Sequence, residues 1–286
     1  TDISPGMWTL CGPLLVSLDT WAYDYINEIM NPLLNYMSKD IATFLSLSHN
    51  GIPLIQLLLK VIEKSLASDD SERELEAKSG ANLLNCLLLC VKPHVQHVQS
   101  LWAPIFHLLM KRISTPDGCK TNNLRIRLLE SGLAMIHAHP EFTLSMMESD
   151  ATNTALTALF FDTLFNCVQD FERTESQRLL VLALSDLIAT PVTSLPLSIR
   201  GNAGAIFTQI LREIALLRES GEDEFLRDAG DDDDDNMGDD GDDDAFGDSD
   251  EDDSDDDGTG IHSKKGTARL LSVPDDGYGE DEDAEC

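Results

Sequence analysis

Apolar residues recur every three or four positions from Met7 to Ser220, which is the spacing of amphipathic α-helices. No alternation of apolar and polar residues between turn signals predicts a β-hairpin in this stretch. We therefore predict an all-α fold. The helices are expected over residues 7–18, 21–37, 52–67, 72–91, 95–113, 121–138, 152–170, 174–190 and 195–218, with a short extra turn at 140–149.

Local signals refine some of these boundaries. Ser71 with Glu74, and Thr174 with Gln177, fit the capping box that begins a helix. Pro104 lies inside the range 95–113, where its missing N–H predicts a kink or a break. The Gly201–Gly204 segment lacks the Lys-Ser/Thr ending of a phosphate-binding loop, so we expect its glycines to permit close helix packing or a bend.

The helices alternate in character along the chain. Residues 83–90 and 179–184 are apolar nearly all round, whereas the helices before them have one polar face. Pairing each two-faced helix with the next gives units over 7–37, 52–91, 95–138 and 152–190, with 195–218 left over. The inner helices begin near 72, 121 and 174, which are spacings of 49 and 53 residues. This exceeds slightly the roughly 40 to 47 residues of HEAT and armadillo units. Stacked pairs explain the pattern, and a compact bundle explains the same periodicity.

Charge divides the chain into two parts. The whole sequence has 20 basic and 52 acidic residues, a net charge of −32, and residues 221–286 alone carry 29 acidic and 4 basic residues. Such a segment repels itself and has little apolar surface to bury, so we expect it to be disordered. We therefore predict helical repeats over 1–220, about four pairs and a last helix, and an acidic tail over 221–286. The acidic balance argues against direct nucleic-acid binding.

Other features exclude further classes of protein. Six cysteines lie mostly in apolar runs, which indicates reduced thiols in the cytosol or nucleus. No signal peptide opens the chain, and no apolar run reaches the roughly 18 to 20 residues that span a bilayer. The chain begins without Met and stops within acidic residues, so we expect it to be a piece of a longer protein.

Several segments, in this order, resemble the C-terminal part of importin-beta family receptors, in particular the branch of importin-7 and importin-8. They are Gly6-Met7-Trp8, Trp21-Ala22-Tyr23-Asp24-Tyr25, Met30-Asn31-Pro32-Leu33-Leu34-Asn35-Tyr36, Ala81-Asn82-Leu83-Leu84, Leu101-Trp102-Ala103-Pro104 and the stretch from Phe171 to Ile188. The resemblance covers most of residues 6–257, because that branch also places an acidic run after the last helix.

The resemblance implies a HEAT-repeat solenoid that carries cargo through nuclear pores under control of the GTPase Ran. The implied partners are basic cargo proteins such as ribosomal proteins and histones, Phe-Gly nucleoporins, and Ran, which binds N-terminal repeats that this chain lacks. The implied localisation is the cytoplasm, the nucleus and the nuclear pore. No Ran-contact residue is carried over to this chain.

The acidic run, defined here as Asp231 to Asp257, is the candidate cargo-binding site. A polyanion attracts Lys- and Arg-rich proteins and speeds their encounter, and its affinity weakens steeply with salt. A solvated tail without a function is the alternative. The candidate residues are Asp231, Asp232, Asp233, Asp234, Asp235, Asp239, Asp240, Asp242, Asp243, Asp244, Asp248, Asp250, Glu251, Asp252, Asp253, Asp255, Asp256 and Asp257.

Two serines and a basic island accompany this run. Ser249 and Ser254 each have an acidic residue three positions later, which is typical of sites for a kinase of the casein-kinase-two type. Lys264, Lys265 and Arg269 follow the run, and they either fold back on it or have no role.

Metal binding and catalysis are less well supported. Cys86, Cys90, His94 and His97 have zinc-ligand chemistry, but Pro93 interrupts the series and the cysteines lie among leucines, which favours buried thiols. His137 and His139 lie at a helix end without a nucleophile motif nearby. We therefore expect no metal, no cofactor and no enzyme activity. The alternative to an import receptor is an acidic-tailed HEAT-repeat scaffold, similar to a histone chaperone, without transport activity.

Overall fold

The structure is a computed structural model that describes residues 3–67 and 73–228, with side chains up to Glu219 in the last helix. The described chain is almost entirely helical, and short 3₁₀ turns join several of the helices. The α-helices are α1 (Pro5–Thr20), α2 (Ile26–Lys39), α3 (Ile41–Ser46), α4 (Leu54–Ala67), α5 (Glu74–Cys90), α6 (Trp102–Ser114), α7 (Asn122–Ala138), α8 (Pro140–Met147), α9 (Ala151–Asn166), α10 (Thr174–Ala189), α11 (Leu197–Arg200) and α12 (Ala203–Asp228).

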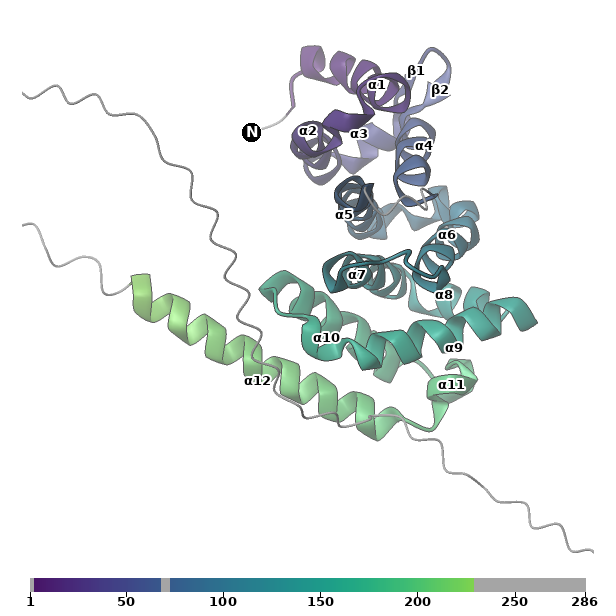
Figure 1. Ribbon diagram of the computed structural model, residues 1–286, viewed down its shortest axis with the longest axis vertical. Helices are drawn as coiled ribbons and strands as arrows, with labels where there is room; N and C mark the ends of the chain where they lie inside the picture. The colour runs from purple at the N-terminus through teal and green to yellow at the C-terminus, as the bar shows by residue number, and fades with distance from the viewer. Residues whose placement is uncertain (1–2, 68–72, 229–286) are drawn as a thin grey trace, which may run out of the picture.

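The helices stack in two layers along one direction (Figure 1). One layer consists of α2, α5, α7, α10 and α12, each packed on the next, and we call it the inner layer. The other layer runs from α1 through α4 and α6 to α8, α9 and α11, and we call it the outer layer. Helices that follow one another in sequence pair across the layers, as α4 does with α5 and α6 with α7. The predicted all-α, HEAT-like solenoid is therefore confirmed.

Polar contacts between units repeat with the period of the stack. Lys64 donates to the Asp19 carbonyl at a separation of 45 residues, and Ser131 Oγ donates to the Ala81 carbonyl at a separation of 50. His137 Nδ1 lies 2.6 Å from Oδ2 of Asp186, at a separation of 49. Equivalent positions in neighbouring units therefore face one another, as the spacing of the inner helices predicted.

The centre of the core is α7, which is buried almost all round between α5 and α10. Its close packing depends on Gly132, because a Cβ built there would lie 2.4 Å from Cε2 of the buried Phe160 ring. Trp102 is also fully buried, and its indole Nε1 donates to Oγ1 of Thr143 over 2.9 Å. Apolar side chains from both layers thus form one continuous core.

One predicted helix in the middle of the chain and one predicted helix cap were wrong. The range 95–113 is not one kinked helix: 3₁₀ turns occupy 92–97 and 99–101, and α6 begins only at Trp102. Pro104 consequently lies in the first turn of α6, where backbone N–H groups have no partner within the helix and its missing donor costs little. Thr174 does not cap α10, because the N-cap residue is Arg173 and no side chain caps the helix. The other predicted capping residue, Ser71, lies outside the described residues.

A small antiparallel pair of strands, which was not predicted, follows α3: β1 (Ser48–His49) and β2 (Ile52–Pro53). Asn50 and Gly51 form the turn with φ of 51° and 79°. Asn-Gly is the preferred sequence for a two-residue hairpin turn in which both residues have positive φ. The two-residue strands are too short for any alternation of apolar and polar side chains to mark them.

The last predicted helix, 195–218, is two helices, α11 and α12, with Gly201 as the C-cap of α11. A Cβ at Gly201 or Gly204 would meet no atom within 4 Å, so these glycines do not serve close helix packing. Among the described residues, no helix is both long and apolar enough to span a bilayer.

Candidate functional site

The predicted cargo-binding residues follow directly after the last helix. Asp231 comes three positions after Asp228, at which α12 ends. All the candidate carboxylates of the acidic run, and both Ser249 and Ser254, lie outside the described residues. Among the described residues, a polar network in the inner layer and two of the cavities are candidate surfaces.

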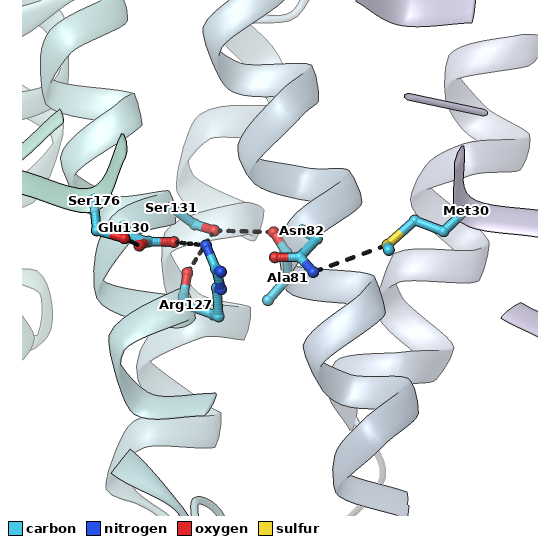
Figure 2. A network of polar contacts seen from close by, with 7 residues as sticks. All are labelled: Met30, Ala81, Asn82, Arg127, Glu130, Ser131 and Ser176. Carbon is cyan, nitrogen blue, oxygen red and sulfur yellow. Dashed lines mark hydrogen bonds and ion pairs between the residues drawn. The ribbon is translucent and has the colours of Figure 1, made fainter. Parts of the chain in front are cut away.

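A polar network crosses four helices of the inner layer (Figure 2). Its centre is Glu130 on α7, whose side chain is 1% exposed. Arg127 donates to Glu130 Oε2 over 2.7 Å, and the Ser176 hydroxyl from α10 donates to the other carboxylate oxygen. The buried charge is therefore paired and hydrogen-bonded on both sides, as its burial requires.

The same network continues toward α5 and α2 through weaker contacts. Ser131 Oγ lies 3.5 Å from the Ala81 carbonyl oxygen, and Asn82 Nδ2 lies 3.9 Å from the sulfur of Met30 (Figure 2). These contacts link α7 to α5 and α5 to α2. We interpret the network as a structural connection between units, since each oxygen of Glu130 already has a partner inside the fold.

A polar cavity of about 250 Å³ opens at the beginnings of α7 and α10. Besides the network residues, Asp170, Glu172 and Arg173 line it. Asn122 reaches across this region, since its Nδ2 donates to Asp170 Oδ2 over 3.3 Å. Charges of both signs line the walls, so the cavity has no strong preference for a cation or an anion.

An apolar cavity of about 210 Å³ lies between α4 and α6 in the outer layer. Leu59 of α4 faces Pro104, Ile105 and Leu108 of α6 across it, and Leu101 and Glu63 complete the lining. Apolar cavities near 150 Å³ are known to hold a benzene ring. This one is therefore large enough to receive one phenyl side chain.

The candidate zinc residues do not come together. The sulfurs of Cys86 and Cys90 lie 3.9 Å apart on one face of α5. The hydrogen bond between them lowers the pKa of Cys90 and, together with burial, raises that of Cys86. His94 and His97 lie in the following 3₁₀ turn, and the described part of the chain holds no group of three or more metal-ligating side chains.

His137 joins three segments near the end of α7. Its Nδ1 lies 2.6 Å from Asp186 Oδ2 of α10, and its Nε2 lies 3.1 Å from Lys92 Nζ. His139 is instead the N-cap residue of α8 and contacts the Phe142 ring. The two histidines therefore have separate structural contacts.

Neither cavity was predicted from the sequence. Glu130 stands among apolar residues on a helix that is buried on every side, and only its own charge marked it out. Pro104 drew attention as a helix breaker, whereas its structural role is to line the outer cavity. The approach of α4 to α6 is a tertiary contact between residues more than 40 positions apart, and a single sequence carries no local signal for it.

Comparison with known proteins gives a consistent set of relatives. The chain is 24% identical to a probable importin-7 homolog of Dictyostelium discoideum over 65% of its length, and 24% identical to human importin-8 over 65%. It is also 24% identical to an importin beta-like SAD2 homolog of Arabidopsis thaliana over 78% of its length. The matched regions cover 17%, 17% and 20% of those relatives.

No family model matches the chain, and no solved structure matches it. The relatives are named as importins. They confirm the resemblance to the importin-beta family, in its importin-7 and importin-8 branch, that was drawn from the sequence.

Proposed function

We propose that this chain is the C-terminal cargo-binding region of a nuclear import receptor. The helical solenoid carries the acidic run at its end, and the run binds basic cargo proteins such as ribosomal proteins and histones. The observation that carries the proposal is the concentration of 29 acidic and only 4 basic residues in 221–286, which begins in the last turns of α12 and continues beyond it. It follows stacked helices whose sequence is similar to that of importins. Ran acts through repeats outside this chain, and the receptor moves between the cytoplasm and the nucleus.

The physical basis is long-range attraction. A cluster of negative charge raises the local concentration of a positively charged partner and speeds association. Because salt screens exposed charges over roughly 8 Å at physiological ionic strength, the affinity falls as salt rises. The same carboxylates compete with nucleic acid for the basic surface of a histone or ribosomal protein.

The test uses the whole chain and a purified core histone as the probe. In one variant, amides replace all 17 aspartates and Glu251 of the acidic run. In the matched control, Glu replaces the 17 aspartates, so the charge is kept and the side chains change. We expect at least about a 10-fold loss of affinity at low salt in the amide variant and near wild-type affinity in the control. Equal affinity in all three proteins would remove the cargo role of the run.

The apolar cavity of the outer layer suits the second class of partner, Phe-Gly nucleoporins. It presents leucines, a proline and an isoleucine, which is the lining that a phenyl side chain prefers. Its place between two helices of the outer layer leaves the inner layer and the acidic run for cargo.

Phe-Gly binding also separates the receptor from the alternative scaffold, which needs no contact with the pore. We expect a Phe-Gly repeat peptide to bind the wild-type chain, and Leu108→Ser to weaken that binding. Leu75→Ser is the control, because Leu75 on α5 is 59% exposed and does not line the cavity. If the peptide binds neither the wild type nor the control, the scaffold explanation is preferred.

Ser249 and Ser254 are proposed phosphorylation sites within the acidic run. Each phosphate adds about −1.5 to −2 charges at neutral pH, which strengthens attraction to basic cargo. Intact-mass measurement after treatment with a kinase of the casein-kinase-two type, on the wild type and on the Ser249→Ala, Ser254→Ala variant, tests the assignment. An equal mass gain in both proteins contradicts it.

A further inference from the structure

The last helix exposes an apolar stripe. Phe207, Leu211 and Ile214 of α12 are 52%, 53% and 47% exposed. Their spacing of four and three residues places them on one face of the helix. Ile206 and Ile210 occupy the neighbouring face, which is buried where α12 packs on α10. We call Phe207, Leu211 and Ile214 the α12 stripe.

The α12 stripe lies at the end of the stack, where no further unit covers the apolar surface of the last helix that the structure describes. Each unit of a solenoid buries its apolar surface against its neighbours, and an end unit normally has a polar outer face. Single exposed apolar residues are common, but three large ones in register form a patch that water solvates poorly. Among the described residues, α10 packs on the neighbouring face of α12 and leaves the stripe exposed.

The chain that follows α12 contains one segment with matching chemistry. Between residues 229 and 286, the large apolar residues stand singly, with one exception: Leu270, Leu271 and Val273 form a cluster. The basic residues Lys264, Lys265 and Arg269 come just before or at its beginning. This segment therefore offers apolar side chains and positive charge together, within an otherwise acidic stretch.

The chain between the end of α12 and this segment is long enough for the segment to return to the α12 stripe. Arg269 is 41 residues after Asp228, and a flexible chain of that length has a root-mean-square span of about 35 Å. Leu211 lies 17 residues before Asp228 on the same helix, which is about 26 Å at 1.5 Å per residue. Repulsion within the acidic run lengthens the span somewhat, and the effective concentration of a tethered segment is highest when span and distance match.

The distribution of charge determines in which direction the segment lies along α12. The basic residues precede the apolar cluster. The part of α12 that follows the α12 stripe, residues 215–228, has five acidic residues and two basic ones, Arg218 and Arg227, so its net charge is negative. Opposite charges meet when the segment runs antiparallel to α12. We propose that residues 264–273 of this chain dock antiparallel on the α12 stripe, with Leu270, Leu271 and Val273 against Phe207, Leu211 and Ile214. The acidic run is then closed into a loop at the end of the solenoid.

Hydrogen exchange on the whole chain tests the docking. We expect the amides of 264–273 to be protected in the wild type, and Leu211→Glu to lower that protection about 10-fold or more, because a charge replaces a buried apolar contact. Leu216→Glu is the matched control: Leu216 lies on the same helix, is 39% exposed, and points to roughly the opposite side from Ile214. The control should keep the protection.

A second variant places the change on the other partner. Leu270→Glu with Leu271→Glu should abolish protection of the segment without altering exchange in α10, which shows that the fold is intact. Protection should also survive moderate salt, since the contact is mainly apolar. This separates the docking from cargo binding by the acidic run, which weakens with salt and is proposed independently.

Three outcomes would overturn the proposal. The first is an unprotected segment in the wild type. The second is equal loss of protection in Leu211→Glu and Leu216→Glu. The third is protection that disappears on dilution while light scattering shows a change from two chains to one, which would mean that a second copy covers the α12 stripe.

Discussion

Among single residues, Glu130 has the largest expected effect on stability. Glu130→Ala leaves the Arg127 guanidinium and the Ser176 hydroxyl without their buried partner. Removing one member of a buried ion pair typically costs about 3 to 5 kcal/mol, because the other charge stays buried and unpaired. We expect a loss of about 3 kcal/mol in the free energy of unfolding, measured by urea denaturation.

The control for this prediction is Glu175→Ala on α10. Glu175 is exposed, and surface substitutions of this kind usually change stability by no more than about 0.5 kcal/mol. Similar losses in both variants would show that the carboxylate contributes charge alone and that the network is not a structural connection.

Glu213 is expected to make the stability of the fold depend on pH. Its carboxyl faces the interior, where Gln209 Nε2 donates to it over 2.5 Å, and burial raises its pKa above the ordinary 4.5. As pH rises, Glu213 ionises at a lower pH in the unfolded chain than in the folded chain. Above pH 4.5, its ionisation therefore favours the unfolded state. Glu213→Gln keeps an acceptor for Gln209 and removes the charge.

We therefore expect Glu213→Gln to be more stable than the wild type at pH 7. The difference should shrink as pH falls through the folded pKa, and disappear below the unfolded value near 4.5. Comparing the two proteins at each pH cancels the titration of the other acidic residues, which both share. A stability difference that stays constant from pH 4 to pH 7 would contradict this account.

At the level of elements, alanine substitutions at two glycines are expected to change stability in opposite directions. A Cβ at Gly132 of α7 would overlap the buried ring of Phe160 on α9, so Gly132→Ala should destabilise the chain by about 1 to 3 kcal/mol. A Cβ at Gly204 in the first turn of α12 meets open space, so Gly204→Ala should stabilise it by up to about 1 kcal/mol. Thermal unfolding of both variants checks the pair, and equal shifts would refute the packing argument.

The extent of sequence prediction is also clearest at the level of elements. The helices α1, α5, α7 and α10 begin and end within about two residues of the expected ranges, because long amphipathic or apolar segments are marked by their own periodicity. The prediction of an α-helix was wrong from residue 95 to Leu101, because the apolar residues there keep helical spacing while the backbone forms 3₁₀ turns.

Of the candidate surfaces, only the acidic run could be predicted from the sequence. Composition alone is enough to find it, because its defining property is its charge. The Leu59 and Leu108 walls of the outer cavity, and the exposure of Leu211, depend on which face of each helix meets a neighbour. Periodicity defines an apolar face but does not state its partner, so these features needed the three-dimensional structure.

For the whole molecule, the stacked arrangement implies that stability is local. Each helix packs on helices of its own unit and of the adjacent units, so the ends of the stack are linked only through the units between them. A compact bundle, which explains the same sequence periodicity, would instead couple every helix to a common core.

Two buried leucines distinguish these cases. Leu58 on α4 and Leu184 on α10 are both fully buried, and a Leu→Ala change in a core costs about 2 to 5 kcal/mol. In a solenoid, Leu58→Ala should speed hydrogen exchange in α1, α4 and α5 and leave α12 nearly unchanged, because α12 packs on α10 at the other end of the stack. Leu184→Ala should do the reverse, with its largest effect in α7, α10 and α12. If each variant speeds exchange equally in α1 and α12, the two ends unfold as one unit, and the independence of neighbouring repeats is disproved.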